Sequence, residues 1–320
     1  IIFYMNYSVI IPFYNEEKNI DNLLDKILLN LNHLKNNNRN FQLIFVDDGS
    51  FDMTFEKLKS KNLKDFSTIL IKHKDNYSQS SAILTGISNS KFDNIITLDG
   101  DGQNDPNDIE KILNVYEKGS DMTIGWRKYR KDNFLTRTLP SYLANSLVRV
   151  FTNSKIHDQG CALKVFKKDK IDDYTDWGDF HRLLAARFSN NNYKVNEVVV
   201  SHHKRINGKS NYGFNRIIYV LLDLLYIRLF KNYKSKSIYL FGSFSFLSFL
   251  LSFLVFLLMI YLKYVYGTSF ILTPLPILSV FFFMSGLIFL FIGFISQLII
   301  NQSRYNDKQR YTISEKIEIS

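Results

Sequence analysis

The stretch NIITLDGDGQNDP, residues 94–106, indicates the fold more directly than any other part of the chain. Its first five residues are apolar or β-branched after Asn94, a pattern typical of a buried strand. Two carboxylates, Asp99 and Asp101, follow at the end of that strand. On an extended segment residues two apart point the same way, so both can converge on one cation, with Gln103 as a third oxygen ligand. Oxygen ligands of this kind suit Mg²⁺ or Mn²⁺ and leave positions open for phosphates.

Two other interpretations of this run are a solvated turn and a calcium loop. Asp and Gly are both turn-forming residues, so the first interpretation stays open on this stretch alone. The second is weaker, because no Glu closes the twelve-residue EF-hand pattern. The rest of the chain has to decide between a turn and a metal site.

Strand-like and helix-like segments alternate before and after this stretch. We expect strands at residues 7–11, 41–46, 68–71 and 94–98, with helices at 17–34, 54–60 and 80–88. This alternation predicts an α/β fold with a mostly parallel sheet covered on both faces. Such sheets bind ligands at the carboxyl ends of their strands, where residues 12–16, 47–48 and 99–101 gather polar groups.

The next region, residues 119–212, is mixed and basic. We expect a strand at 122–125, a helix at 134–151 and extended segments at 162–166 and 195–201. Arg127 follows the first of these strands.

Charge and cysteine content narrow the class of protein. The 320-residue chain has a formal net charge of +10 and one cysteine, Cys161. A single cysteine excludes an internal disulfide framework and fits a reducing compartment, with Cys161 expected in the core. The basic balance favours nucleic acid, an anionic membrane surface or an acidic substrate as partner. No nucleic-acid-binding motif is visible, so we expect no nucleic acid partner, and no cleavable signal peptide is evident.

Two long apolar runs predict a transmembrane hairpin. Residues 238–262 carry no charge and residues 270–300 form a second such run, each long enough to cross a bilayer core of about 30 Å. Lysines and arginines precede the first run and follow the second, so the positive-inside rule places the preceding region and the following tail in the cytoplasm. Residues 214–230 suit an amphipathic helix at the membrane interface, with a core-packing helix as the alternative.

Five motifs in order resemble family 2 glycosyltransferases of the GT-A fold. They are SVIIPFYNEE (8–17), VDDGS (46–50), DGDGQ (99–103), DQGCALKVF (158–166) with His181-Arg182, and HKRINGKSNYG (203–213). The later motifs and the hairpin are similar to the polyprenyl-phosphate glycosyltransferase branch, which includes dolichyl-phosphate mannose synthases and bacterial undecaprenyl-phosphate glycosyltransferases. Ser78 stands where relatives commonly carry glycine.

The resemblance implies roles for individual residues. The expected nucleotide-sugar-binding residues are Pro12, Tyr14, Glu16, Val46, Asp48, Leu98, Asp99 and Gly100. The metal, Mg²⁺ or Mn²⁺, would be held by Asp99, Asp101 and Gln103. Basic residues expected to bind phosphate are Arg127, Arg137, Arg205 and Lys209. The residues expected to act in the chemistry are Asp101, Arg127 and Asp158, the last of which would orient the sugar or the nucleophile.

The resemblance also implies the reaction. A polyprenyl phosphate, undecaprenyl or dolichyl, would attack the anomeric carbon of a nucleotide-diphosphate hexose in a single inverting displacement. A phosphate monoester has a second pKa near about 6, so it is largely ionised at neutral pH and needs no dedicated base. We favour a uridine diphosphate sugar over guanosine diphosphate mannose. Members of the branch often form oligomers, which makes a homo-oligomer an open expectation.

Other functions stay open at this point. One is a membrane glycosyltransferase that acts on a glycan or glycolipid hydroxyl, although the Gln-x-x-Arg-Trp motif of processive synthases is missing. The others are a catalytically silent membrane scaffold and a nucleotidyltransferase. The expected organisation is a cytoplasmic catalytic domain (1–212), a juxtamembrane amphipathic helix (213–236), two spans in an inner-membrane segment (237–301) and a cytoplasmic tail (302–320).

Overall fold

The computed structural model contains two compact units. Residues 1–225 together with 310–320 form the first unit, and residues 226–309 form the second. The structure describes residues 5–35, 37–129, 146, 148–149, 154–171, 180–203, 237–270, 273–303 and 312–319. The expected helices at 134–151 and 214–230 lie almost wholly outside these ranges.

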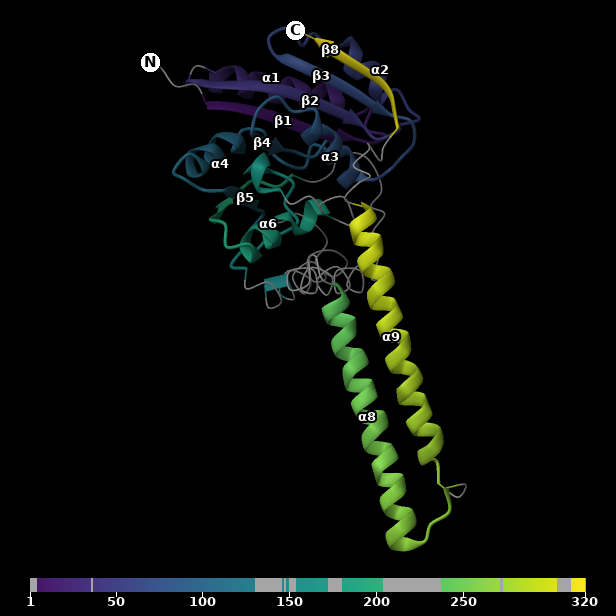
Figure 1. Cartoon of the computed structure of the whole chain (residues 1–320). Coiled ribbons are helices and arrows are strands. Elements are labelled where there is room, and N and C mark those ends of the chain that lie inside the picture. Colours follow the sequence, from purple (N-terminus) through teal and green to yellow (C-terminus); the bar gives the residue numbers. More distant parts are fainter. Residues whose placement is uncertain are drawn as a thin grey trace. The chain divides into compact units, whose positions relative to one another are not determined.

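The first unit is built on one eight-stranded sheet with the order β7-β5-β6-β4-β1-β2-β3-β8 (Figure 1). Its strands are β1 (Met5–Phe13), β2 (Arg39–Asp47), β3 (Ser67–His73), β4 (Asn94–Thr97), β5 (Met122–Trp126), β6 (Lys164–Lys167), β7 (Val195–Val199) and β8 (Ile313–Ile319). The pairs β1–β2, β1–β4, β2–β3 and β5–β7 are parallel, whereas β6 and β8 pair antiparallel with their neighbours. The predicted mostly parallel α/β sheet is therefore confirmed.

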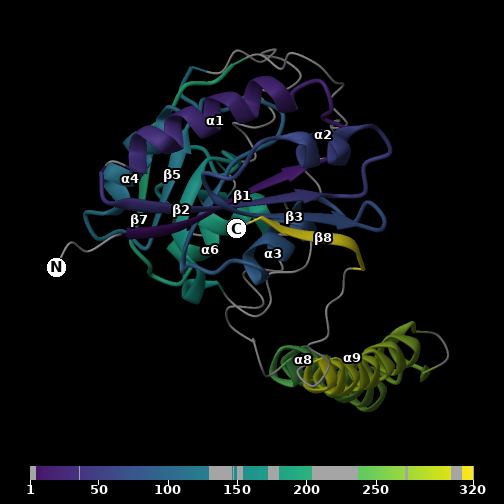
Figure 2. The ribbon, with the colours of Figure 1, turned by 90° about the horizontal axis from the view of Figure 1, so that it is seen from above.

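Helices cover both faces of this sheet. They are α1 (Ile20–Lys35), α2 (Thr54–Ser60), α3 (Gln79–Ser88), α4 (Asp108–Tyr116) and α6 (Phe180–Asn190). Figure 2 shows α1 and α2 on one face and α3 and α6 on the other. In α1 the apolar residues recur every three or four positions, so one stripe of the helix is buried on the sheet.

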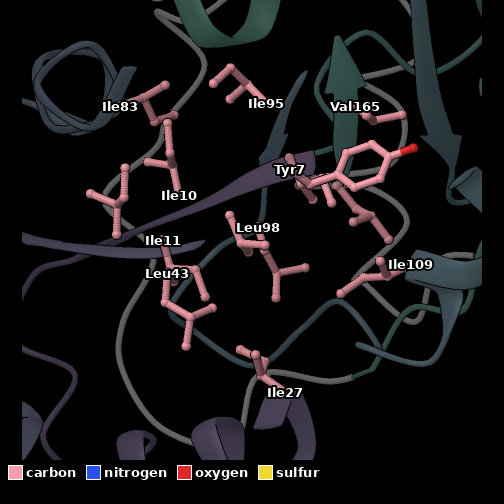
Figure 3. Close-up of a cluster of buried hydrophobic side chains, with 14 of the residues drawn as sticks. Tyr7, Ile10, Ile11, Ile27, Leu43, Ile83, Ile95, Leu98, Ile109 and Val165 are labelled. Carbon is pink, nitrogen blue, oxygen red and sulfur yellow. The ribbon is translucent and has the colours of Figure 1, made fainter. Parts of the chain in front are cut away.

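The core lies between the sheet and these helices. Strands β1 and β2 are nearly continuous apolar runs because both of their faces are covered. Figure 3 shows side chains from several elements meeting there, among them Ile10 and Ile11 of β1, Leu43 of β2 and Ile27 of α1. Cys161 is fully buried, as expected for a core cysteine.

The edge strand beside β3 comes from the far end of the chain. Residues 313–319, which the sequence places in a tail, form β8 and pair antiparallel with β3. The Ser314 hydroxyl donates to the Lys72 carbonyl at 3.0 Å, and Lys59 pairs with Glu315 at 2.7 Å. The chain therefore leaves the first unit, forms the second and returns to complete the sheet.

The second unit is a pair of antiparallel helices, α8 (Ser237–Tyr266) and α9 (Leu275–Ser303). Both are long and apolar enough to cross a membrane, with a mean hydropathy of 2.5. The buried residues of α8 are all serines. The hydroxyls of Ser245 and Ser252 donate to the carbonyls of Gly286 and Ser279, each at 2.8 Å, which draws the two backbones together. These contacts support the predicted hairpin.

Candidate active site

The polar clusters predicted from the sequence meet at the carboxyl ends of adjacent parallel strands. Strand β1 lies between β2 and β4, so the loops that follow these three strands are neighbours. The Asp48 amide donates to the Phe13 carbonyl at 2.8 Å, and the Leu98 amide donates to the Ile10 carbonyl at 3.2 Å. This is the rim where open α/β sheets bind their ligands.

The loop after β1 is fastened to the loop after β2. The Asn15 amide donates to the Ser50 hydroxyl and the Glu16 amide to the Thr54 hydroxyl, both at 2.9 Å. Asn15 has a φ of 55°, a conformation that asparagine tolerates better than most residues. The side chain of Tyr14 is 41% exposed and lies edge-on to Phe51. An accessible aromatic ring therefore stands at the end where a nucleotide was predicted.

Other residues predicted to bind the nucleotide have buried side chains. Pro12, Val46 and Leu98 are buried, so a ligand would reach them through the backbone. Asp48 is 3% exposed, and its carboxylate accepts hydrogen bonds from the amides of Tyr77 and Ser78 and contacts the His73 ring at 2.8 Å. In this structure Asp48 organises the loop that precedes α3.

Ser78 occupies a backbone conformation that favours glycine. Its φ is 133°, and its hydroxyl accepts from the Ser81 amide at the start of α3. The substitution noted in the sequence thus places a side chain where backbone strain is expected.

Asp99 and Asp101 stand together after β4, as predicted. The Asp101 carboxylate accepts from the Gln103 amide at 3.0 Å, and the Asp99 carboxylate accepts from the Gln79 side chain at 2.6 Å. Burial, and then repulsion from Asp101, raise the pKa of Asp99 to about 6. Two crowded carboxylates fit a hard divalent cation, which would relieve their repulsion.

Gly100 lets this loop approach β1. A Cβ atom there would lie 2.7 Å from the Pro12 carbonyl oxygen and 2.6 Å from the Phe13 ring. Any side chain at this position would push the two aspartates away from the end of β1.

Arg127 and Asp158 form one unit rather than two separate groups. The guanidinium donates to the carboxylate through Nε at 2.7 Å and through Nη2 at 3.0 Å. Burial alone would lower the pKa of Arg127, but the Asp158 carboxylate outweighs it and raises that pKa. Asp158 is 2% exposed. The carboxylate therefore orients the arginine, and its hydrogen-bonding capacity is largely used in doing so.

Lys164 is a basic residue of the site that the sequence reasoning did not single out. Its side chain is 3% exposed, and its ammonium donates to the His181 carbonyl. Burial lowers its pKa to about 8. With Asp99 and Gln79 it lines a cavity of about 10 Å³, room for one water molecule. Its place in the DQGCALKVF motif was the available signal.

The structure does not cover every predicted residue. Arg137, Arg205 and Lys209 lie outside the described ranges. Within those ranges no group of three or more His, Cys, Asp or Glu side chains is placed to hold a metal, so the two aspartates would need oxygens from the substrate to complete a site.

Comparisons with known proteins match this architecture. Residues 8–175 match the family model described as glycosyl transferase family 2. The chain is 31% identical over 299 residues to the dodecaprenyl-phosphate galacturonate synthase of Rhizobium johnstonii, covering 91% of this chain and 87% of that one. It is 33% identical over 222 residues to the undecaprenyl-phosphate 4-deoxy-4-formamido-L-arabinose transferase of Proteus mirabilis, covering 68% of this chain and 66% of that one.

Solved structures share the fold. Mannosyl-3-phosphoglycerate synthase from Rubrobacter xylanophilus superposes with a TM-score of 0.53 at 13% identity, over 71% of this chain and 75% of that one. Glucosyl-3-phosphoglycerate synthase from Mycobacterium tuberculosis gives 0.51 at 13% identity, over 70% and 79%.

Proposed function

The chain belongs to glycosyl transferase family 2, and we propose that it transfers a hexose from a nucleotide-diphosphate sugar to a polyprenyl phosphate. The observation that carries this proposal is the similarity to the dodecaprenyl-phosphate galacturonate synthase, which covers 91% of this chain and so includes residues beyond the catalytic unit. A lipid-linked acceptor also fits the two apolar helices.

In this proposal the residues of the site have different binding roles. Tyr14 and Glu16 would contact the nucleoside, and Asp99, Asp101 and Gln103 would hold Mg²⁺ or Mn²⁺ against the donor diphosphate. The cation would neutralise charge on the leaving diphosphate when bound. Arg127, fixed by Asp158, would bind a phosphate through the part of its guanidinium that Asp158 does not occupy.

The acceptor supplies its own nucleophile. An ionised phosphate oxygen would form the new bond to the anomeric carbon while the bond to the nucleotide diphosphate breaks, with inversion. Because the nucleophile is already charged, orientation and electrostatic stabilisation can carry most of the rate. This explains why Asp158 can be committed to Arg127 rather than to proton transfer.

We propose that the catalytic unit lies on the cytoplasmic side of the inner membrane. Strand β8 follows the hairpin and belongs to the same sheet as β1, so both ends of the hairpin must lie on one side. Lys231, Lys234 and Lys236 before α8, with Arg304 and Lys308 after α9, support the cytoplasmic side.

A transfer assay tests the proposal. Purified protein in detergent is given polyprenyl phosphate, Mn²⁺ or Mg²⁺ and a panel of labelled nucleotide sugars, with uridine diphosphate sugars first. We expect an organic-extractable product that disappears with EDTA and in Asp101→Ala. Asp93→Ala is the matched control, because Asp93 is an exposed carboxylate before β4, at the opposite end of that strand.

The alternatives give different results in the same assay. Label transferred only to a glycan or glycolipid would indicate a hydroxyl acceptor. Folded protein that binds nucleotide but transfers nothing with any donor would favour the silent scaffold.

A further inference from the structure

The segment that carries Asp158 is itself held by a carboxylate on another strand. Glu197 lies on β7, beside β5, and its side chain is 11% exposed. Its carboxylate accepts from the Asp158 amide at 2.9 Å and from the His157 amide at 3.0 Å, and lies 2.8 Å from His157 Nδ1. Among the residues that the structure describes, the contacts of this carboxylate all go to two consecutive residues, His157 and Asp158.

His157 and Asp158 in turn contact the last residue of β5, Trp126, and the residue that follows it, Arg127. Asp158 clamps the guanidinium of Arg127, and its carboxylate also lies 3.3 Å from the Arg127 amide. The His157 ring stacks on the ring of Trp126, with centroids 4.4 Å apart and planes 15° apart. Trp126 ends β5 and Arg127 follows it. Glu197 is therefore connected to Arg127 in two ways. Asp158 contacts both the amide and the guanidinium of the arginine, and His157 packs on Trp126, the residue before it.

The side chain of Glu197 is not needed to hold β7 against β5. Strands β5 and β7 already pair through their backbones over Met122–Trp126. The neighbouring residue Asn196 points to the other face and donates to the Ser120 hydroxyl at 2.6 Å, away from Arg127. The backbone of Glu197 takes part in this pairing, opposite Ile124, whereas its side chain fixes the loop that aims the arginine.

We propose that Glu197 is a positioning residue for the transfer reaction, acting through His157 and Asp158 on the guanidinium of Arg127. The inference deepens the proposed function and rests on it, because the arginine is taken to bind a phosphate of donor or acceptor. An arginine fork recognises phosphate only when its plane is correctly oriented. Loss of Glu197 would leave Arg127 in place but misdirected.

Trp126 provides a probe that does not depend on activity. The chain has two tryptophans, and Trp177→Phe leaves Trp126 alone. In that background we expect Glu197→Gln to release the stack on His157 and to increase quenching of Trp126 emission by acrylamide. Asn196→Ala, the matched control on the same strand, should leave the quenching unchanged. Equal quenching in Glu197→Gln and its parent would overturn the inference, whatever the reaction proves to be.

Kinetics then test the connection to Arg127. We expect Glu197→Gln to lower kcat/KM by about tenfold to a hundredfold, as a displacement of a binding group by about 1 Å can do. In an Arg127→Lys background the same change should cost less than about twofold, since the fork it orients is gone. Equal losses in both backgrounds, or a loss that follows the melting temperature, would show that Glu197 only supports the fold.

The two proposals fail in different ways. If the parent protein makes no polyprenyl-phosphate sugar with any donor, the proposed function is wrong, and the quenching result still decides whether Glu197 positions the segment. If the parent is active and Glu197→Gln matches it, the positioning role alone is wrong.

Discussion

Replacing Lys164 by methionine should stabilise the catalytic unit at neutral pH. The Lys164 ammonium is buried, donates to one backbone carbonyl, and forms no ion pair with the residues that the structure describes. Methionine fills a similar volume without a charge. Burying an ammonium without a close counter-ion is unfavourable, so removing it should raise the free energy of unfolding.

The structure gives the size of this effect. Burial lowers the pKa of Lys164 from 10.5 to about 8, which corresponds to about 3 kcal/mol of unfavourable free energy for the charged form. Against this, the His181 carbonyl loses its partner, at a cost of about 1 kcal/mol. We expect a net gain of about 2 kcal/mol, or about 4–8 °C in melting temperature for a unit of this size.

The sign of the pH dependence gives a sharper test. The unfolded chain binds more protons than the folded chain between pH 8 and 10.5, so the wild type gains stability as the pH rises through that window. The methionine variant lacks this group, and its advantage should shrink by pH 10. The measurement is unfolding in detergent with EDTA at pH 7 and pH 10.

A matched variant controls for loss of a lysine. Lys168→Met removes a half-buried ammonium that donates to the carbonyl and hydroxyl of Ser90, and we expect no stabilisation. A Lys164→Met protein less stable than the wild type at pH 7, or an advantage that does not shrink at pH 10, would refute the reasoning. The buried charge would then be compensated by its surroundings.

Four further changes test other parts of the structure. Asp101→Asn should abolish metal-dependent binding of the nucleotide sugar, measured by calorimetry with and without Mn²⁺, and intact binding would argue against the metal site. Ser78→Gly should raise the free energy of unfolding by about 1 kcal/mol, because the φ of 133° suits glycine; a loss in denaturant titrations would contradict this. Burial would raise the pKa of Glu117, but the hydrogen bonds from Arg39 and Tyr7 and the charge of Arg39 together lower it, so the contribution of Glu117 to stability is present above pH 4.5 and fades below it. Glu117→Gln should therefore destabilise the protein at pH 7 but much less at pH 3, and an equal loss at both would exclude this ion pair. Gly286→Leu should separate α8 from α9, because a Cβ there already lies 2.7 Å from the Phe249 ring, and crosslinking between engineered cysteines should fall.

Local patterns predicted most of the sheet. The structure contains the strands predicted at 7–11, 41–46 and 68–71, each longer by one or two residues at either end. They were predictable because a strand covered on both faces is a nearly continuous apolar run. Helix α4 and helix α6 were not predicted. Strand β8 was missed for a different reason: its sequence, ISEKIEI, is half polar, and its partner β3 is remote in the chain.

The motifs predicted which residues gather at the carboxyl ends of the strands, but not the contacts among those residues. The sequence brought Asp99 and Asp101 together correctly but gave Asp158 and Arg127 separate roles, whereas the structure joins them in one ion pair. Lys164 lies in a motif that does not indicate its burial, and Glu197 lies in none of the motifs and contacts a distant loop. Such contacts depend on which strands become neighbours, as β5 and β7 do here.

The return of the chain as β8 also has a consequence for biosynthesis. Ser314 and His73 touch across the sheet although 241 residues separate them. At a synthesis rate of about 5–20 residues per second, the edge of β3 waits about 12–50 seconds for its partner, while both apolar helices are made. An unpaired strand edge is a template for aggregation during that time. The sheet can therefore be completed only after both apolar helices have been made, so a chain whose synthesis stalls within the hairpin would be an early target for chaperones and proteases.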